Sequence, residues 1–98
     1  MTDERVKEVC DLYINKVAGF GPPSKMADLG YPLDKAEALR HVAWMALQVK
    51  GFIDEKRTEK AMRWLGFMQG WLVAFSIYPI SETMIHNAPA GTKFDEAR

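Results

Sequence analysis

One stretch of the chain, residues 64–81, contains no charged side chain, although 27% of the chain is charged. It begins WLGFMQGWLVAF and reads like part of a membrane-spanning helix. Pro79 limits that helix to about residues 64–78, which would extend only about 22 Å. This length is short of the roughly 30 Å hydrocarbon core of a bilayer, and Gln69 lies near its middle. We therefore predict a helix that is buried in a folded protein rather than one that crosses a membrane.

Small residues recur every fourth position in this stretch and form a ridge along the predicted helix. Each glycine inside a helix costs about 0.5–1 kcal/mol relative to alanine, so packing at the ridge must offset roughly 1–2 kcal/mol. A single neighbouring helix covers only one stripe of such a helix, and a large apolar surface left over is typical of an interface. We therefore predict a homo-oligomer with an interface formed by Trp64, Gly66, Phe67, Gly70, Trp71 and Ala74.

The N-terminal part of the chain predicts one helix followed by a loop. Apolar residues fall every three or four positions over roughly residues 3–17, and the pattern stops before Gly19. The segment GFGPPS at 19–24 cannot continue a helix because its paired prolines lack the N–H donor and fix φ. We expect a loop from there to Leu33, held against the core by Phe20, Met26, Leu29 and Tyr31.

A helical hairpin is predicted in the middle of the chain. Asp34 is a favourable N-cap for a helix over about 34–53, and Glu37 completes a pair that resembles a capping box. Apolar positions in this helix, and in a third helix over about 56–77, alternate in steps of three and four. These positions form one apolar seam along each helix. Two matching seams and a short connection favour an antiparallel hairpin. The predicted fold is all-α, with this hairpin, the N-terminal helix and a short C-terminal helix at about 81–86 in a single domain over 1–88, followed by a flexible tail at 89–98.

Composition narrows the classes of partner. The 13 basic and 13 acidic residues cancel, and a net charge of zero argues against broad electrostatic attraction to nucleic acid or anionic lipid. The charged N-terminus lacks the apolar core of a signal peptide. The one cysteine, Cys10, allows no internal disulfide and occupies an apolar helix position, where a thiol is normally inert. We expect a protein of the cytoplasm, without a membrane partner.

Few residues suit catalysis or metal binding. His41, His86 and Cys10 are far apart in the sequence and lack the paired spacing of metal ligands. We expect His41 to be half-buried and His86 to be exposed. The acidic residues fall at helix ends and turns, unlike the facing carboxylates that all-α nucleotide pyrophosphohydrolases use to hold magnesium. We therefore predict no catalytic site, metal or cofactor; a small metal-dependent nucleotide hydrolase stays an alternative if the carboxylates converge.

One group of residues favours ligand binding. On the second predicted helix an arginine, a histidine and a tryptophan are neighbours, and another arginine enters the third helix from a charged turn. An aromatic ring beside a guanidinium can stack a base or hold a phosphate, and it can equally anchor a protein partner. Alternatively, the tryptophans belong to the core and the arginines lie over them. The candidate ligand-binding residues are Lys25, Arg40, His41, Trp44 and Arg63.

The segments LRHVAWM, EKAMRWLGFMQGWL and ISETMIHNAP resemble a group of small uncharacterised proteins of tailed phages. Those proteins share a His-x-x-Trp-Met helix and an Arg-Trp-Leu-Gly-Phe-x-Gln-Gly helix, and the resemblance covers about residues 38–89. The chain departs from their pattern at Val73, where they often have tryptophan. Trp71 lies two residues earlier, about 200° around the helix. The role of the tryptophan in those phage proteins therefore does not transfer to Trp71.

The resemblance implies the setting of a small phage accessory protein in the cytoplasm of a bacterial host. Such proteins commonly inhibit a host protein, redirect a host enzyme or sequester a defence signal, and none of these roles requires catalytic residues. Together with the residue analysis, it predicts a non-enzymatic, oligomeric helical binding protein whose partner is a host protein or a small nucleotide. The alternative is a structural or regulatory oligomeric module that binds no small ligand.

Overall fold

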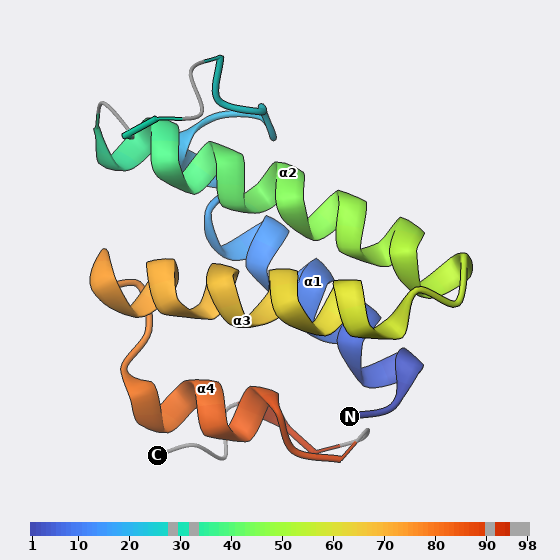
Figure 1. Ribbon diagram of the computed structural model, residues 1–98. Helices are drawn as coiled ribbons and strands as arrows, with labels where there is room; N and C mark the ends of the chain where they lie inside the picture. Colours follow the sequence, from blue (N-terminus) through green and yellow to red (C-terminus); the bar gives the residue numbers. More distant parts are fainter. Residues whose placement is uncertain (28–29, 32–33, 90–91, 95–98) are drawn as a thin grey trace.

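The chain forms helices and no strands in the part that the computed structural model describes, residues 1–27, 30–31, 34–89 and 92–94 (Figure 1). The predicted all-α fold is therefore confirmed at this level. Leu29, predicted to hold the loop, lies outside the described residues. In chain order the helices are α1 (Asp3–Lys16), a short 3-10 helix (Ala18–Phe20), α2 (Lys35–Asp54), α3 (Thr58–Ala74) and α4 (Ile80–His86).

Side chains cap the N-termini of α1 and α2. The hydroxyl of Thr2 accepts a hydrogen bond from the backbone N–H of Arg5 at 3.1 Å. The carboxylate of Asp34 accepts one from the N–H of Glu37 at 2.7 Å, as predicted for that residue. Both bonds satisfy N–H groups that have no carbonyl partner in the first helical turn.

The C-terminus of α3 is closed by backbone hydrogen bonds. Ser76 has a positive φ of 63°, which turns the chain so that its N–H donates to the carbonyl of Val73 at 3.0 Å. The N–H of Ile77 then donates to the carbonyl of Leu72 at 2.8 Å. This pair of bonds is a Schellman motif, which usually places glycine at the position that Ser76 occupies.

The same motif ends α2, where Lys56 has a φ of 62°. As a result α3 begins at Thr58 and ends at Ala74, so it is shorter than the predicted range of about 56–77. The prediction that Pro79 ends this helix was wrong, because the turn at Ser76 stops it earlier. Pro79 instead precedes α4 at its N-cap position.

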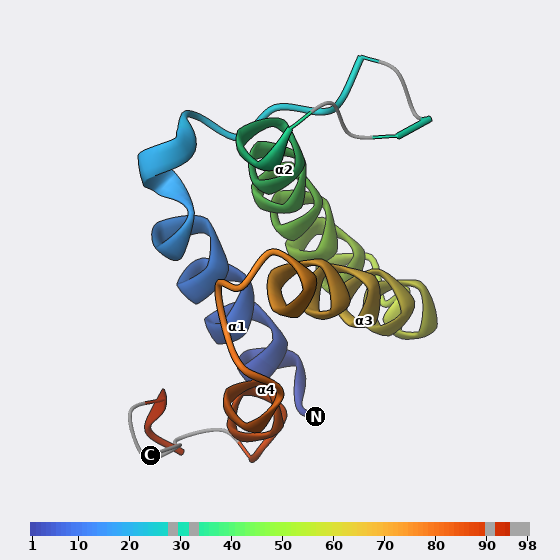
Figure 2. The ribbon, with the colours of Figure 1, turned by 90° about the vertical axis from the view of Figure 1, so that its left-hand side faces the viewer.

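The two helices of the hairpin, α2 and α3, pack against each other and are joined by residues 55–57 (Figure 1). α1 also packs against α2, and Figure 2 shows it on the other side of the bundle from α3. The predicted seams are buried in all three helices. The buried members are Val6, Val9, Cys10, Tyr13 and Val17; Ala38, Val42, Met45, Val49 and Phe52; and Ala61, Leu65, Met68 and Leu72. Phe75, also predicted for the third seam, is half-buried and lies at the C-cap of α3.

A buried arginine joins α1 to the C-terminal end of α4. The guanidinium of Arg5 donates to the carbonyls of His86 at 3.0 Å, Ile85 at 2.8 Å and Thr92 at 2.8 Å. It also lies 4.3 Å from the centroid of the Phe94 ring. A cation at a helix C-terminus is favoured by the helix dipole and satisfies carbonyls that lack a partner. Two residues of the predicted tail thus pack against the domain.

His86 is 1% exposed, so the expectation that it lies at the surface was wrong. Its Nδ1 is 2.7 Å from the hydroxyl of Tyr13, and the amide of Gln69 donates to that hydroxyl at 3.0 Å. Since the Tyr13 oxygen accepts from Gln69, its proton is available to His86 Nδ1. The amide of Gln69, within the uncharged stretch, thereby has a hydrogen-bond partner.

Among the described residues, no helix is long and apolar enough to cross a bilayer.

Replacing Ser76 by glycine should stabilise the protein. A residue with a Cβ pays about 1–2 kcal/mol in the left-handed conformation, and glycine avoids most of that cost while gaining entropy in the unfolded chain. We expect Ser76→Gly to raise the free energy of unfolding by about 0.5–1 kcal/mol in urea denaturation. Ser76→Ala, which keeps the Cβ, is the matched control. Equal stability of the two variants would contradict this account of the α3 terminus.

Stability should decrease as the pH falls below about 6.5. Burial lowers the pKa of His86, with the positive charge of Arg5 acting in the same direction and Glu82 opposing it. Burial also lowers the pKa of His41. The unfolded chain therefore takes up protons at a higher pH than the folded chain, and each histidine contributes a loss of up to about 1.4 kcal/mol per pH unit.

Urea denaturation at a series of pH values measures this slope. His86→Gln retains an acceptor for the Tyr13 hydroxyl but does not titrate, so it should remove about half of the slope between about pH 6.5 and 5.5. A wild-type protein as stable at about pH 5.5 as at about pH 7.5 would show that neither histidine is held neutral by the fold.

Candidate functional site

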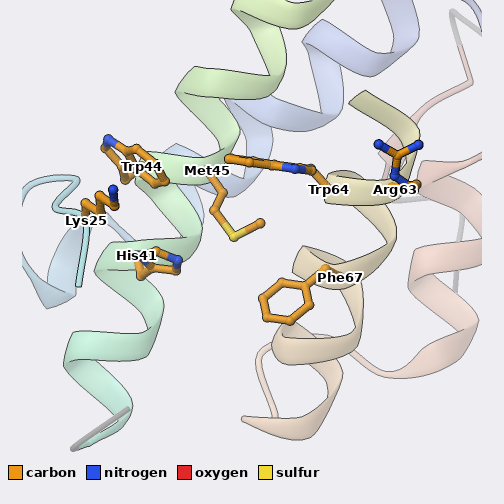
Figure 3. Close-up of a pocket in the computed structure, with 7 residues that line it drawn as sticks. All are labelled: Lys25, His41, Trp44, Met45, Arg63, Trp64 and Phe67. Carbon is orange, nitrogen blue, oxygen red and sulfur yellow. The ribbon is translucent and has the colours of Figure 1, made fainter. Parts of the chain in front are cut away.

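A cavity of about 510 Å³ opens between α2 and α3 (Figure 3). Its size falls within the range of small-molecule sites. α2 and α3 supply most of its walls, and the loop before α2 supplies one lysine at the edge. The residues that line it are Lys25, His41, Trp44, Met45, Arg63, Trp64 and Phe67.

Aromatic rings form a nearly continuous wall along this opening. The Trp44 and Trp64 ring centroids are 6.0 Å apart, which links the two helices. On one side Trp64 meets Phe52 edge-on at 4.9 Å. On the other side His41 stacks on Trp44 at 5.4 Å with an interplanar angle of 27°. Because each of these rings is held by its neighbours, the wall has a defined shape.

The ionisable groups in the lining are all basic. The ammonium of Lys25 lies 5.4 Å from the centroid of the Trp44 ring, within the range of a cation–π contact. Neither Lys25 nor Arg63 forms an ion pair with any residue that the structure describes. Lys60, just outside the lining, lies 5.6 Å from the centroid of the Trp64 ring. The cavity therefore favours a negatively charged ligand.

His41 is 9% exposed and is held in one protonation form. Its Nδ1 accepts a hydrogen bond from the backbone N–H of Met26 at 3.0 Å. Burial lowers its pKa, and the charge of Lys25 acts in the same direction, with Glu37 opposing. The ring is therefore neutral at pH 7, and because Nδ1 is the acceptor, Nε2 carries the proton.

Arg40 does not line the cavity, in contrast to the other four candidate ligand residues. Its guanidinium donates to the carbonyl of Phe20 at 3.2 Å, and its own carbonyl accepts from the N–H of Ser24 at 3.1 Å. Its side chain also packs under Gly21, whose φ is 122° and whose position would place a Cβ 2.8 Å from Arg40 Cδ. Arg40 thus holds the loop that carries Lys25, a role that the sequence pattern did not indicate.

A second cavity, also of about 510 Å³, adjoins the first. His41 and Phe67 line both, so they form the boundary between them. Tyr31 contributes to the second cavity but is 92% exposed, so the prediction that it holds the loop against the core was wrong. Met26, predicted for the same role, is buried and does hold the loop. The remaining lining residues of this cavity are Gly30, Trp71, Ala74 and Phe75.

The two glycines of the small-residue ridge on α3 face open space in the part of the chain that the structure describes. A Cβ built on Gly66 or Gly70 would meet no heavy atom within 4 Å. Ala74 is exposed as well. Of the aromatic residues predicted for the same interface, Trp64, Phe67 and Trp71 line the two cavities. The predicted interface residues therefore divide into two groups. Trp64, Phe67, Trp71 and Ala74 line the cavities, whereas Gly66 and Gly70 face open space.

Other reactive groups lie apart from the cavity. Cys10 is buried and its pKa is raised to about 12, chiefly by burial, so its thiol stays protonated at neutral pH. Within the described ranges, no three histidine, cysteine, aspartate or glutamate side chains lie close enough together to hold a metal ion.

No protein family model, no curated protein and no solved structure matches this chain. The cavity between α2 and α3 is therefore the feature from which a function can be inferred.

Proposed function

We propose that the protein binds, without chemically changing it, a small anionic ligand that contains a planar ring. The observation that supports this is the lining of the first cavity, where two tryptophans meet basic groups and no carboxylate. Tryptophan offers the apolar surface that a ring needs, while Lys25 and Arg63 offer charge to a phosphate or carboxylate.

A nucleotide is the biological ligand that combines these two properties. In the setting implied by the resemblance to phage proteins, the role would be counter-defence by capture of a nucleotide signal in the host cytoplasm. Inhibition of a host protein is the rival role, because exposed tryptophan and arginine are also typical of protein interfaces. The nearly continuous aromatic wall and the size of the cavity favour the small ligand.

Removing either cation should weaken binding of an anionic ring. For a panel of linear and cyclic nucleotides measured by isothermal titration calorimetry, we expect Lys25→Gln and Arg63→Gln each to reduce the affinity of the best ligand by about 3- to 10-fold. The dependence of affinity on salt should decrease in both variants, because each loses a charge at the cavity.

Lys93→Gln is the matched control, since Lys93 is exposed and outside both cavities. It should leave the affinity unchanged. If no nucleotide binds to the wild-type protein, the small-ligand function is wrong, and the aromatic wall becomes a candidate surface for a protein partner.

We also propose that the open face of α3 associates with a second copy of the chain. Gly66 and Gly70 cost the isolated helix roughly 1–2 kcal/mol, and no packing among the described residues offsets this cost. Phe67, beside this ridge, is 47% exposed. Residues 64–81 carry no charge, so pairing two such faces brings no like charges together.

Gly70→Leu should break such an assembly, because a large side chain prevents close approach of the helices. Native mass spectrometry and light scattering at micromolar concentration measure the subunit number and any small molecule that co-purifies. Ala74→Ser, which keeps a small side chain on the same ridge, should leave the assembly intact. A monomeric wild-type protein would contradict the proposed association.

A further inference from the structure

The ring of His41 is a buried polar group in the wall that the two cavities share. The residue is 9% exposed, and its ring centroid lies 5.4 Å from that of Trp44 and 6.0 Å from that of Trp71. One nitrogen faces the loop and accepts from Met26. Figure 3 shows the other nitrogen directed into the space between α2 and α3. No residue in the described part of the chain bonds to it.

We infer that the Nε2–H of His41 donates a hydrogen bond to an acceptor on the ring of the bound ligand, and so selects for rings that carry a carbonyl oxygen or an unprotonated nitrogen. This inference rests on the proposed function, since it concerns the ligand of the same cavity. It narrows that ligand from any planar anion to one with a hydrogen-bond acceptor in the ring, as nucleobases have.

The selection follows from the direction of the Met26 bond. As long as Nδ1 accepts from that backbone N–H, the cavity-facing nitrogen is a donor. A ring that covers this donor without offering an acceptor leaves it unpaired and loses the hydrogen bond that it made to water. The neighbouring rings of Trp44 and Trp71, with centroids 5.4 Å and 6.0 Å away, limit how far the imidazole can turn. A ring that presents an acceptor replaces the lost hydrogen bond to water, so its binding is not weakened in this way.

Two probes of equal shape and charge isolate this effect. An isoquinolinesulfonate differs from the corresponding naphthalenesulfonate by one ring nitrogen in place of a C–H, and both carry the same anionic group. We expect the wild-type protein to bind the isoquinoline about 3- to 10-fold more tightly in calorimetry, the range for one hydrogen bond.

Two substitutions distinguish the roles of the two imidazole nitrogens, because each keeps a polar atom near only one of them. His41→Asn places an oxygen near the position of Nδ1, so the Met26 bond is kept and the cavity donor is removed. His41→Gln places an amide N–H near the position of Nε2, so the cavity donor is kept. We expect the preference for the isoquinoline to disappear in His41→Asn and to persist in His41→Gln. Phe67→Leu, which changes the wall without a polar group, should weaken both probes equally.

A long-range proton–nitrogen correlation spectrum of the labelled full-length protein tests the same geometry without a ligand. It should show His41 neutral at pH 7 with its proton on Nε2. A proton on Nδ1 would overturn the inference, because Met26 could then not donate to that atom.

The binding results distinguish this inference from the function on which it rests. If both probes bind with equal affinity to the wild-type protein, ring selection by His41 is wrong and binding of planar anions stands. The same conclusion follows if His41→Asn weakens both probes equally, since the histidine would then contact the sulfonate. If neither probe nor any nucleotide binds, the proposed function fails and the inference fails with it.

Discussion

The contact between α2 and α3 depends on a difference in side-chain size across the hairpin. The distance between packed helices is set by the side chains at their contact. At the inner seam these include Ala38 and Ala61, which are fully buried. At the outer edge Trp44 and Trp64 are half-buried and keep the space beside the seam open as a cavity. The candidate site is therefore a consequence of how the core packs, and a change in the seam would alter the cavity.

A second constraint acts at the opposite end of the bundle. Arg5 places a cation against the last carbonyls of α4, and among the described residues no side-chain nitrogen or oxygen that is fully shielded from solvent lacks a hydrogen-bond partner. A charge with its hydrogen bonds satisfied is tolerated in a protein interior, whereas the loss of one partner is costly. α4 is a short helix of 7 residues and would be marginal alone, so this contact with α1 accounts for its position.

The polar groups of the cavity depend on the loop before α2. Hydrogen bonds from Met26 to His41 and from Arg40 to Phe20 hold that loop on the helix. The first of these also determines which nitrogen of the imidazole faces the cavity. Charge, aromatic surface and a polar imidazole group thus meet at one place, as in small-molecule sites where a few polar groups fix the orientation of a ligand on an apolar wall.

The sequence by itself determined the helices, their buried faces and the cap at Asp34, because these follow from residues close together in the chain. It also identified four of the residues that line the cavity: Lys25, His41, Trp44 and Arg63. The tertiary structure alone decided the burial of His86, which depends on Arg5 and Tyr13 from the other end of the chain. It likewise decided that Arg40 braces a loop and that the glycines of α3 face open space in the described part of the chain. Periodicity reports which side of a helix is apolar, but which segment covers that side depends on contacts between residues far apart in the chain.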